Sequence, residues 1–223
     1  MIISGWAVRF GWSVVTEGVK FSGSKKRLVV LSITAAVALG VGAVQAGAIA
    51  GSLNLRGKGT FCLSPEAARN LAARSVTFEA IAPATVDGTC VTMPGAGTLA
   101  PDLTGGEVPL EGGMRFQGSG HRLDITRMSG HVRLNEGYNT ADVAVDGGPA
   151  ANLDIAHWPV SMSRVSMTPT TVSMKDNPLT LTDAAKAAFA QAFGAGPTAE
   201  GQALFLFTGK AEITNPFGGL SRP

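Results

Sequence analysis

A chain of 223 residues with 45% hydrophobic residues can bury a sizeable core, which excludes an intrinsically disordered protein. The formal net charge of +2 is unevenly distributed: residues 1–46 carry five basic residues and one acidic residue, and the remainder carries 13 basic and 15 acidic residues. Because this larger part is mildly acidic and has no basic stripe, the sequence argues against nucleic acid as a partner.

The N-terminal region has the pattern of an export signal. Three basic residues at 25–27 precede an uncharged run that continues to Arg56, and the apolar core of this run covers about 28–44. Small residues follow it, as at signal-peptidase sites. The run is also long enough to span a bilayer, which takes about 20 residues. The sequence leaves cleavage or retention open, but the flanking basic residues predict a cytoplasmic N-terminus and an exported body.

These features predict four regions. They are a cytoplasmic or leader extension (1–27), a signal peptide or transmembrane helix (28–50), an exported β-rich domain (51–215) and a flexible tail (216–223). No linker composition divides 51–215, so we expect one domain there.

The two cysteines, Cys62 and Cys90, fit an oxidising compartment. An even pair in an exported chain predicts a disulfide, here closing a loop of 28 residues. The chain-entropy model assigns such a bridge roughly 3–4 kcal/mol. Two cysteines without a CxxC motif do not make a structural zinc site.

Two short helices are predicted, at 63–71 and 181–189. Ser64 and Thr182 are suitable N-caps, and alanines follow each of them. The two segments align without gaps, and a strand-like run follows each. This pattern fits a diverged duplication and equally fits two ordinary capped helices.

The rest of the body consists of short apolar segments separated by turn residues. The segments are 75–82, 114–118, 122–128, 131–135, 141–148, 152–160, 164–174 and 203–214. Several alternate with period two, as half-buried strands do. Asp146, Gly147 and Gly148 supply the positive φ angles of a hairpin turn. We therefore predict a mainly β fold, an antiparallel β-sandwich or barrel with two short helices.

Catalytic motifs are scarce. The sequence contains no G-x-S-x-G, H-E-x-x-H, P-loop or G-x-G-x-x-G motif. A triad can be drawn from Ser119 and His121 with Asp124 or Asp154, but nothing orients the first two for proton transfer. Calcium ligands can be drawn from Asp142, Asp146 and Asp154, but their spacing matches no EF-hand. We expect a protein that is not an enzyme and holds no metal through these residues.

The remaining candidates for ligand binding are His121, His131, His157 and Tyr138, the last being the only tyrosine. Imidazole and phenolate both serve as ligands of haem iron. The alternative is that each histidine is an ordinary surface residue. If 114–135 is a hairpin that turns near Ser129 and Gly130, His121 and His131 lie on facing strands.

Two stretches carry a resemblance to a known family. The runs "GGMRFQGSGHRLDIT" (112–126) and "NPLTLTDAAKAAFAQAFGAGPTAEGQAL" (177–204) resemble the HtaA-type domains of actinobacterial cell envelopes, over roughly 95–210. The resemblance implies an exported, β-rich domain associated with haem capture, in which His121 supports the axial ligand. The family's haem-ligating tyrosine lies near the domain start, and this chain has no tyrosine before Tyr138. The iron would need another ligand, or haem binding has been lost while the scaffold persisted.

The predicted function is thus an exported cell-envelope binding or structural domain without catalytic activity, acting in protein interaction or as a surface scaffold. The alternative is a haem-binding domain of HtaA type that uses His121, His131 and Tyr138. The predicted partners are the membrane, through 28–50, and envelope proteins. The predicted location is extracytoplasmic, either secreted or anchored to the cell membrane.

Overall fold

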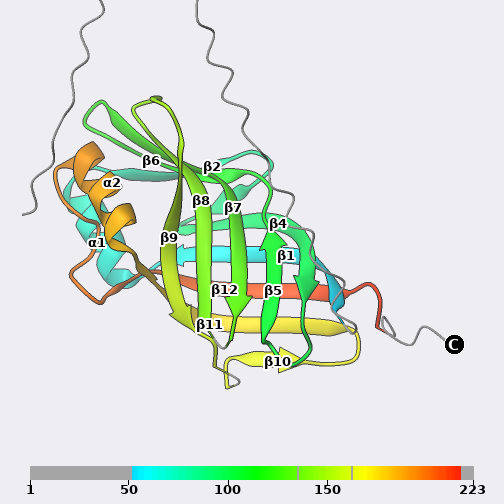
Figure 1. Ribbon diagram of the computed structural model, residues 1–223. Helices are drawn as coiled ribbons and strands as arrows, with labels where there is room; N and C mark the ends of the chain where they lie inside the picture. Colours follow the sequence, from blue (N-terminus) through cyan, green and yellow to red (C-terminus); the bar gives the residue numbers. More distant parts are fainter. Residues whose placement is uncertain (1–51, 135, 162, 217–223) are drawn as a thin grey trace, which may run out of the picture. The chain divides into compact units, whose positions relative to one another are not determined.

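The computed structural model describes residues 52–216 except 135 and 162 (Figure 1). The predicted signal or transmembrane segment at 28–50 and all but one residue of the predicted tail lie outside the described residues. The strands are β1 (Leu53–Leu63), β2 (Thr77–Ile81), β3 (Thr85–Asp87), β4 (Cys90–Leu99), β5 (Gly105–Pro109), β6 (Gly113–Gly118), β7 (His121–Arg133), β8 (Glu136–Val145), β9 (Ala151–Pro159), β10 (Val165–Met167), β11 (Thr171–Leu181) and β12 (Ala203–Ile213). The helices are α1 (Pro65–Ala73) and α2 (Asp183–Phe193).

Eight of these strands form a closed antiparallel barrel. Their order is β7-β5-β4-β1-β12-β11-β9-β8, and the pairing of β8 with β7 closes the ring. In Figure 1 the strands β9, β8, β7 and β5 run upright in front of β4, β1, β12 and β11, which run crosswise. The barrel is therefore two four-stranded sheets packed nearly at right angles and joined at their edges. The prediction of a mainly β fold is confirmed, and of the two architectures it is the barrel.

The remaining strands extend the barrel wall. β2 pairs with β6, and β6 pairs with β7. β3 pairs with β4, and β10 pairs with β11. The hairpin of β6 and β7 reaches beyond the barrel, and this extension positions His121.

Both predicted helices are confirmed, together with their caps. The hydroxyls of Ser64 and Thr182 accept hydrogen bonds from the backbone N–H groups of Ala67 and Ala185, each at 3.2 Å. The first helix starts with a proline, whose fixed φ suits that position. The second ends at Gly194, whose φ of 78° favours glycine. Among the described residues, neither helix is long and apolar enough to cross a membrane.

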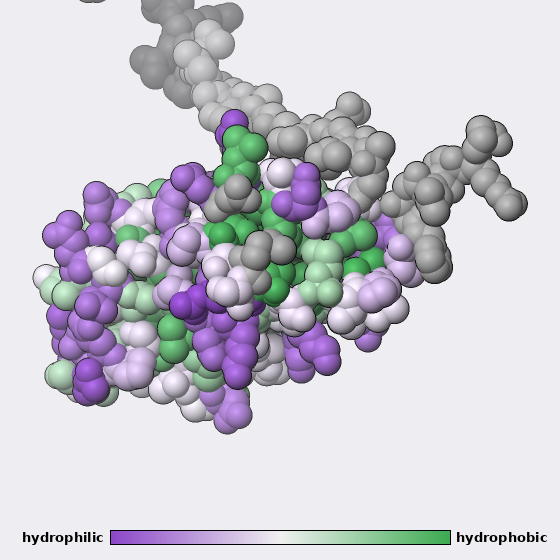
Figure 2. All heavy atoms as spheres, turned by 90° about the horizontal axis from the view of Figure 1, so that it is seen from below, coloured by the Kyte–Doolittle hydropathy of each residue, from purple (hydrophilic) through white to green (hydrophobic). Residues whose placement is uncertain are grey.

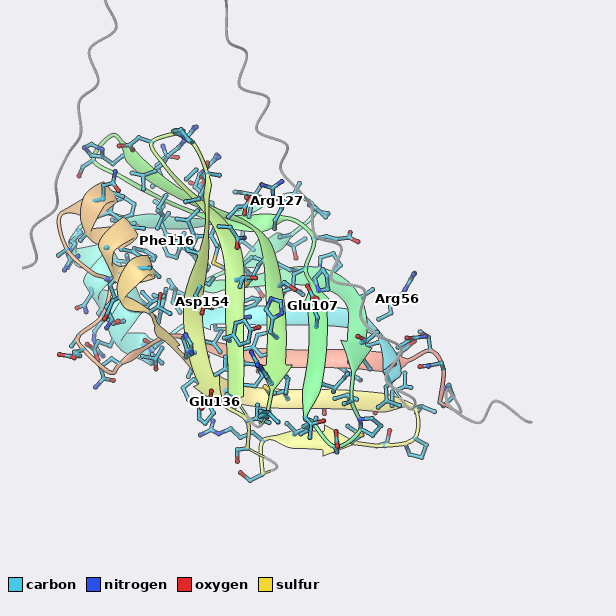
Figure 3. The ribbon with its side chains drawn as sticks, in the orientation of Figure 1. Arg56, Glu107, Phe116, Arg127, Glu136 and Asp154 are labelled. Atoms are coloured by element: carbon cyan, nitrogen blue, oxygen red, sulfur yellow. A yellow bond between two sulfur atoms is a disulfide. The ribbon has the colours of Figure 1, made fainter. Side chains whose placement is uncertain are left out.

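The helices lie beside the barrel on the left of Figure 1 and bury their alanine-rich faces against it. The aromatic rings of Phe116 on β6 and Phe189 on α2 meet edge to face, with centroids 4.8 Å apart. In Figure 3, Phe116 lies close to α2. This contact belongs to the larger of two apolar clusters. The smaller cluster consists of Leu55, Leu99, Leu103, Val172 and Ile213.

The predicted disulfide is confirmed. Cys62 on β1 and Cys90 on β4 are register partners and are joined by an S–S bond across a sequence separation of 28. The bridge ties two neighbouring barrel strands next to the start of α1.

The predicted turn near Ser129 and Gly130 is wrong. Residues 121–133 form the single strand β7, so His121 and His131 lie on the same strand. The chain turns earlier, at Ser119 and Gly120, whose φ angles are 52° and 81°. Gly130 lies inside the strand opposite Asn139, where a β-carbon would stand 3.4 Å from the Asn139 amide nitrogen.

The expected strand at 164–174 is also divided. A turn in which Thr168 N–H donates to the carbonyl of Thr171 separates β10 from β11. None of the predicted segments corresponds to β1, β3, β4 or β5; on β1 and β4, glycine occupies inward positions and masks the apolar alternation. The predicted turn at Asp146 and Gly147 is confirmed by φ angles of 52° and 72°.

Candidate functional site

The three predicted ligand residues fall in two separate places. His121 is the first residue of β7, at the tip of the β6–β7 hairpin. His131 and Tyr138 are register partners on β7 and β8. Ten residues of extended strand separate His121 from His131, a distance on the order of 30 Å. The structure thus brings His131 and Tyr138 together and leaves His121 apart.

A carboxylate from the neighbouring hairpin holds His121. The Nδ1 atom of His121 lies 2.9 Å from Oδ2 of Asp146, which follows β8. The other carboxylate oxygen of Asp146 accepts the backbone N–H of Arg122 at 2.8 Å. An ionised carboxylate only accepts hydrogen bonds, so Nδ1 carries the proton and Nε2 of the neutral ring presents a lone pair.

The charge of Asp146 is stabilised where it lies. Its pKa is lowered, first by the hydrogen bond from His121 and second by the backbone N–H of Arg122. The carboxyl group therefore stays ionised to lower pH than an isolated aspartate. Both partners remain partly open to solvent, with 54% of the His121 side chain and 45% of the Asp146 side chain exposed.

His121 lines a cleft of about 320 Å³ between the β6–β7 hairpin and the C-terminal end of α2. Figure 1 shows the tips of the β6–β7 and β8–β9 hairpins side by side next to α2. The cleft has mixed chemistry and is lined by Arg74, Val76, Gly118, Ser119, His121, Ala190, Gln191, Ala192, Phe193 and Gly194. Arg74 donates to the carbonyls of Ala195 and Gly196 at 3.1 and 2.9 Å, which holds the ends of the two helices together.

A second group of rings lies on the outer face of the barrel. His131, Tyr138 and His157 are register partners on β7, β8 and β9. The His131 and Tyr138 rings stack with centroids 4.6 Å apart and planes 10° apart, and the Tyr138 and His157 centroids are 6.4 Å apart. We call these three residues the ring ladder. Figure 3 labels Glu107 on β5, the strand next to β7, and Asp154 on β9, the strand that carries His157.

The ring ladder lines neither the His121 cleft nor the cavity inside the barrel. The Nε2 atom of His131 lies 2.9 Å from the hydroxyl of Thr140. The Nε2 atom of His157 lies 3.5 Å from a carboxylate oxygen of Asp154. The ladder is therefore a feature of the barrel surface, with His131 and Tyr138 half-buried and His157 exposed.

The triad and the calcium site drawn from the sequence do not assemble. Asp124 pairs with Arg115 at 2.6 Å and not with His121. Asp142 is bonded by Arg127 and by the Asn152 amide. No group of three or more His, Cys, Asp or Glu side chains that could hold a metal is found among the described residues.

Sequence reasoning missed the partner of His121 and the walls of its cleft. The register Leu123 to Val145 places the start of β7 beside the turn after β8, and so places His121 beside Asp146. Recognising 121–133 as one strand would have revealed this pairing. Phe193 and Arg74 both line the cleft, although they lie at the ends of two helices that are far apart in the sequence. Nothing in the local sequence signals that they meet there.

Comparison with known proteins supports the same fold. No protein-family model and no curated protein matches the chain. Among solved structures, the C-terminal domain of HtaA from Corynebacterium glutamicum matches with a TM-score of 0.56 and 16% identity, over 72% of this chain and 99% of that domain. The N-terminal domain of HtaA matches with a TM-score of 0.47 and 16% identity, over 71% of this chain and 97% of that domain. The haem-binding protein HtaB from the same organism has a TM-score of 0.46 and 16% identity, over 72% of this chain and 95% of that protein.

Only the first of these matches is close enough to carry an argument. At 16% identity it concerns the arrangement of the backbone and not the residues of a site. The resemblance to HtaA-type domains seen in the sequence is thus confirmed at the level of the fold: this chain has the fold of the C-terminal domain of HtaA.

Proposed function

We propose that this chain is a binding domain without catalytic activity and that its ligand is haem, held in the His121 cleft. The observation that carries the proposal is the His121–Asp146 pair, with Nδ1 of the imidazole 2.9 Å from the carboxylate. Histidines that bind metals typically use the other ring nitrogen to contact a carboxylate in this way. The resemblance to HtaA-type domains, which are associated with haem capture, supports the same ligand.

Three residues of the cleft have side chains suited to different parts of a haem molecule: the iron, the flat ring and a carboxylate substituent. Haem would supply an iron centre, for which the Nε2 lone pair of His121 is a suitable ligand. Phe193 is half-buried at the end of α2 and offers an aromatic contact to a flat macrocycle. Arg74 places a cation at the edge of the cleft, where it would favour a carboxylate substituent.

The size of the cleft limits how the ligand would bind. A volume of about 320 Å³ is at the low end for ligand pockets, which span roughly 300–1,000 Å³. The cleft would cover one edge of a porphyrin and leave the rest exposed. Tyr138 lies far from the cleft, so a tyrosine ligand of the kind found in the family has no counterpart here.

The proposed location is extracytoplasmic, and the disulfide supports it, because such bridges persist in oxidising compartments. Attachment to the membrane through 28–50 is part of the same proposal and depends on the sequence alone. N-terminal sequencing of the mature protein from cells would distinguish a cleaved signal from a retained anchor.

Titration of the full-length chain with haemin tests the proposed ligand. We expect a saturable Soret shift that His121→Ala weakens strongly and that His131→Ala leaves unchanged. His131→Ala is the matched control because it removes the same side chain from the same strand. Absence of a Soret shift in the unmodified chain would overturn the proposal.

A second candidate function is protein interaction through the ring ladder. The three stacked rings on the barrel surface favour it, since aromatic side chains are enriched at interfaces. A crosslinking reagent placed at residue 138 (Tyr138→Cys) should then capture a specific envelope protein in cells. The same reagent at the exposed position Arg127 would serve as the control.

A further inference from the structure

The barrel contains a cavity that the proposed haem site does not use. Its volume is about 150 Å³, and residues from all eight barrel strands line it. Both apolar clusters contribute to its lining. Leu55 and Val172 come from the smaller cluster, and Phe61 and Trp158 come from the larger one. A barrel of eight strands is normally just filled by its side chains or holds one small ligand.

Glycines are concentrated in the wall of this cavity. Gly57 and Gly95 are register partners on β1 and β4, and Gly59 and Gly209 are register partners on β1 and β12. All four line the cavity, as does Gly130 on β7. At Gly57, Gly59 and Gly95 a β-carbon would stand only 2.1–2.7 Å from neighbouring atoms, so the wall is closely packed there, whereas at Gly130 the nearest atom would be 3.4 Å away.

A buried amide faces this space. Asn139 is 5% exposed and lines the cavity from β8. The indole N–H of Trp158 donates to Oδ1 of Asn139 at 3.1 Å, which turns the Nδ2 group away from Trp158. Gly130 is the register partner of Asn139, and a β-carbon there would stand 3.4 Å from Nδ2. The glycine therefore keeps the amide donor uncovered, and no acceptor for Nδ2 is found among the described residues.

A second buried amide lies on β11, outside the cavity lining. Asn177 is 1% exposed, and neither its nitrogen nor its oxygen has a hydrogen-bond partner among the described residues. It follows Met174 and precedes Leu179 on β11, and both of these residues line the cavity. Leaving such a group unpaired is costly, and native proteins rarely do so without a functional reason.

We propose that this cavity binds a small, largely apolar molecule of about one aromatic ring that carries a hydrogen-bond acceptor for the Asn139 amide. The size follows from the volume, because an apolar cavity of about this volume accommodates benzene. A porphyrin does not fit, so this site is independent of the proposed haem site. Hydrophobic residues gather near the centre of the face shown in Figure 2, which is the end of the molecule where β10 lies.

Two probes of equal size test the proposal. Acetophenone carries a carbonyl acceptor, and isopropylbenzene has the same number of non-hydrogen atoms without one. We expect acetophenone to shift the indole N–H resonance of Trp158 saturably in the full-length chain. We expect it to bind about fivefold to tenfold more tightly than isopropylbenzene, the effect of one net hydrogen bond.

Substitutions at Gly130 locate the binding site. Gly130→Val should fill the cavity and abolish binding of both probes. Gly130→Ala should cover Nδ2 and remove the preference for acetophenone while the near-ultraviolet circular dichroism stays native. Gly196→Ala is the matched control, because a β-carbon there meets nothing closer than 3.7 Å and the residue lies outside the cavity lining.

The outcomes are distinct from those of the haem test. Haemin binding should be the same in Gly130→Ala as in the unmodified chain. If the unmodified chain shows no saturable shift of the Trp158 indole, the proposal is overturned. Probe binding that both Gly130 substitutions leave unchanged would equally overturn it. If Gly130→Val does not fold, the smaller Gly130→Ala substitution decides.

Discussion

His121 and His131 lie on the same strand, ten residues apart, yet their surroundings differ in every respect that matters for binding. His121 has its Nδ1 held by Asp146 and lines a cleft. His131 has its Nε2 at 2.9 Å from a threonine hydroxyl and stacks on Tyr138 on an open sheet face. On the proposed function, His121 is the better candidate ligand because of the partner of its other nitrogen and the cleft around it, not because of residue type alone.

The largest expected effect separates the two histidines directly. We expect His121→Ala to weaken haemin binding by about 100-fold or more, because it removes the iron ligand itself and not only a group that orients it. We expect His131→Ala to change the affinity less than twofold. Equilibrium titration of the Soret band measures both. If both substitutions weaken haemin binding equally, the His121 cleft is not the specific haem site.

The next effect concerns the carboxylate partners. We expect Asp146→Asn to weaken haemin binding by about 10- to 100-fold, the usual cost of losing a residue that orients a metal ligand. Asp154→Asn is the matched control, since Asp154 lies 3.5 Å from His157 in the ring ladder. The same titration measures both variants. If Asp154→Asn weakens binding as much as Asp146→Asn, Asp146 has no special role.

A smaller effect concerns the aromatic contacts. We expect Phe193→Ala to weaken haemin binding by about fivefold, because an aromatic contact is worth roughly 1 kcal/mol. Removing the ring of the ladder by Tyr138→Ala should leave the affinity unchanged. If Tyr138→Ala weakens haemin binding and Phe193→Ala does not, haem binds at the ring ladder and not in the His121 cleft.

The smallest effect is a pH dependence of stability. The hydrogen bond from His121 and then the N–H of Arg122 hold the pKa of Asp146 below its ordinary value. A lowered folded-state pKa stabilises the native chain above the unfolded pKa of about 3.9 and ceases to do so as the pH falls through the folded value.

Denaturant unfolding of the unmodified chain and of Asp146→Asn measures this contribution. The unmodified chain should be slightly more stable at neutral pH, and the difference should shrink as the pH falls below about 4. The exposure of Asp146 keeps the difference small. A difference that grows towards acid pH would have the wrong sign for this pair.

Much of the fold could be predicted from the sequence, because its signals are local. The caps at Ser64 and Thr182 and the turn at Asp146 and Gly147 each depend on a few neighbouring residues. Four strands were missed (β1, β3, β4 and β5), and on β1 and β4 the reason is that glycines take inward positions where apolar side chains would otherwise mark the alternation. Gly130 was read as a turn for the same reason.

The site could be predicted only in part. His121 was identified from its glycine-rich surroundings, but its partner Asp146 lies 25 residues away and meets it through the pairing of β7 with β8. His131 and Tyr138 were named with His121 as ligand candidates, but their rings stack on each other away from His121. Concavity is a property of the assembled barrel and its helices, and no local pattern encodes it.

The most direct test identifies the axial ligand of bound haem by magnetic circular dichroism of the full-length chain loaded with haemin. The account predicts the signature of an imidazole ligand that disappears in His121→Ala and returns when free imidazole is added. A phenolate signature that survives His121→Ala and disappears in Tyr138→Phe would contradict it.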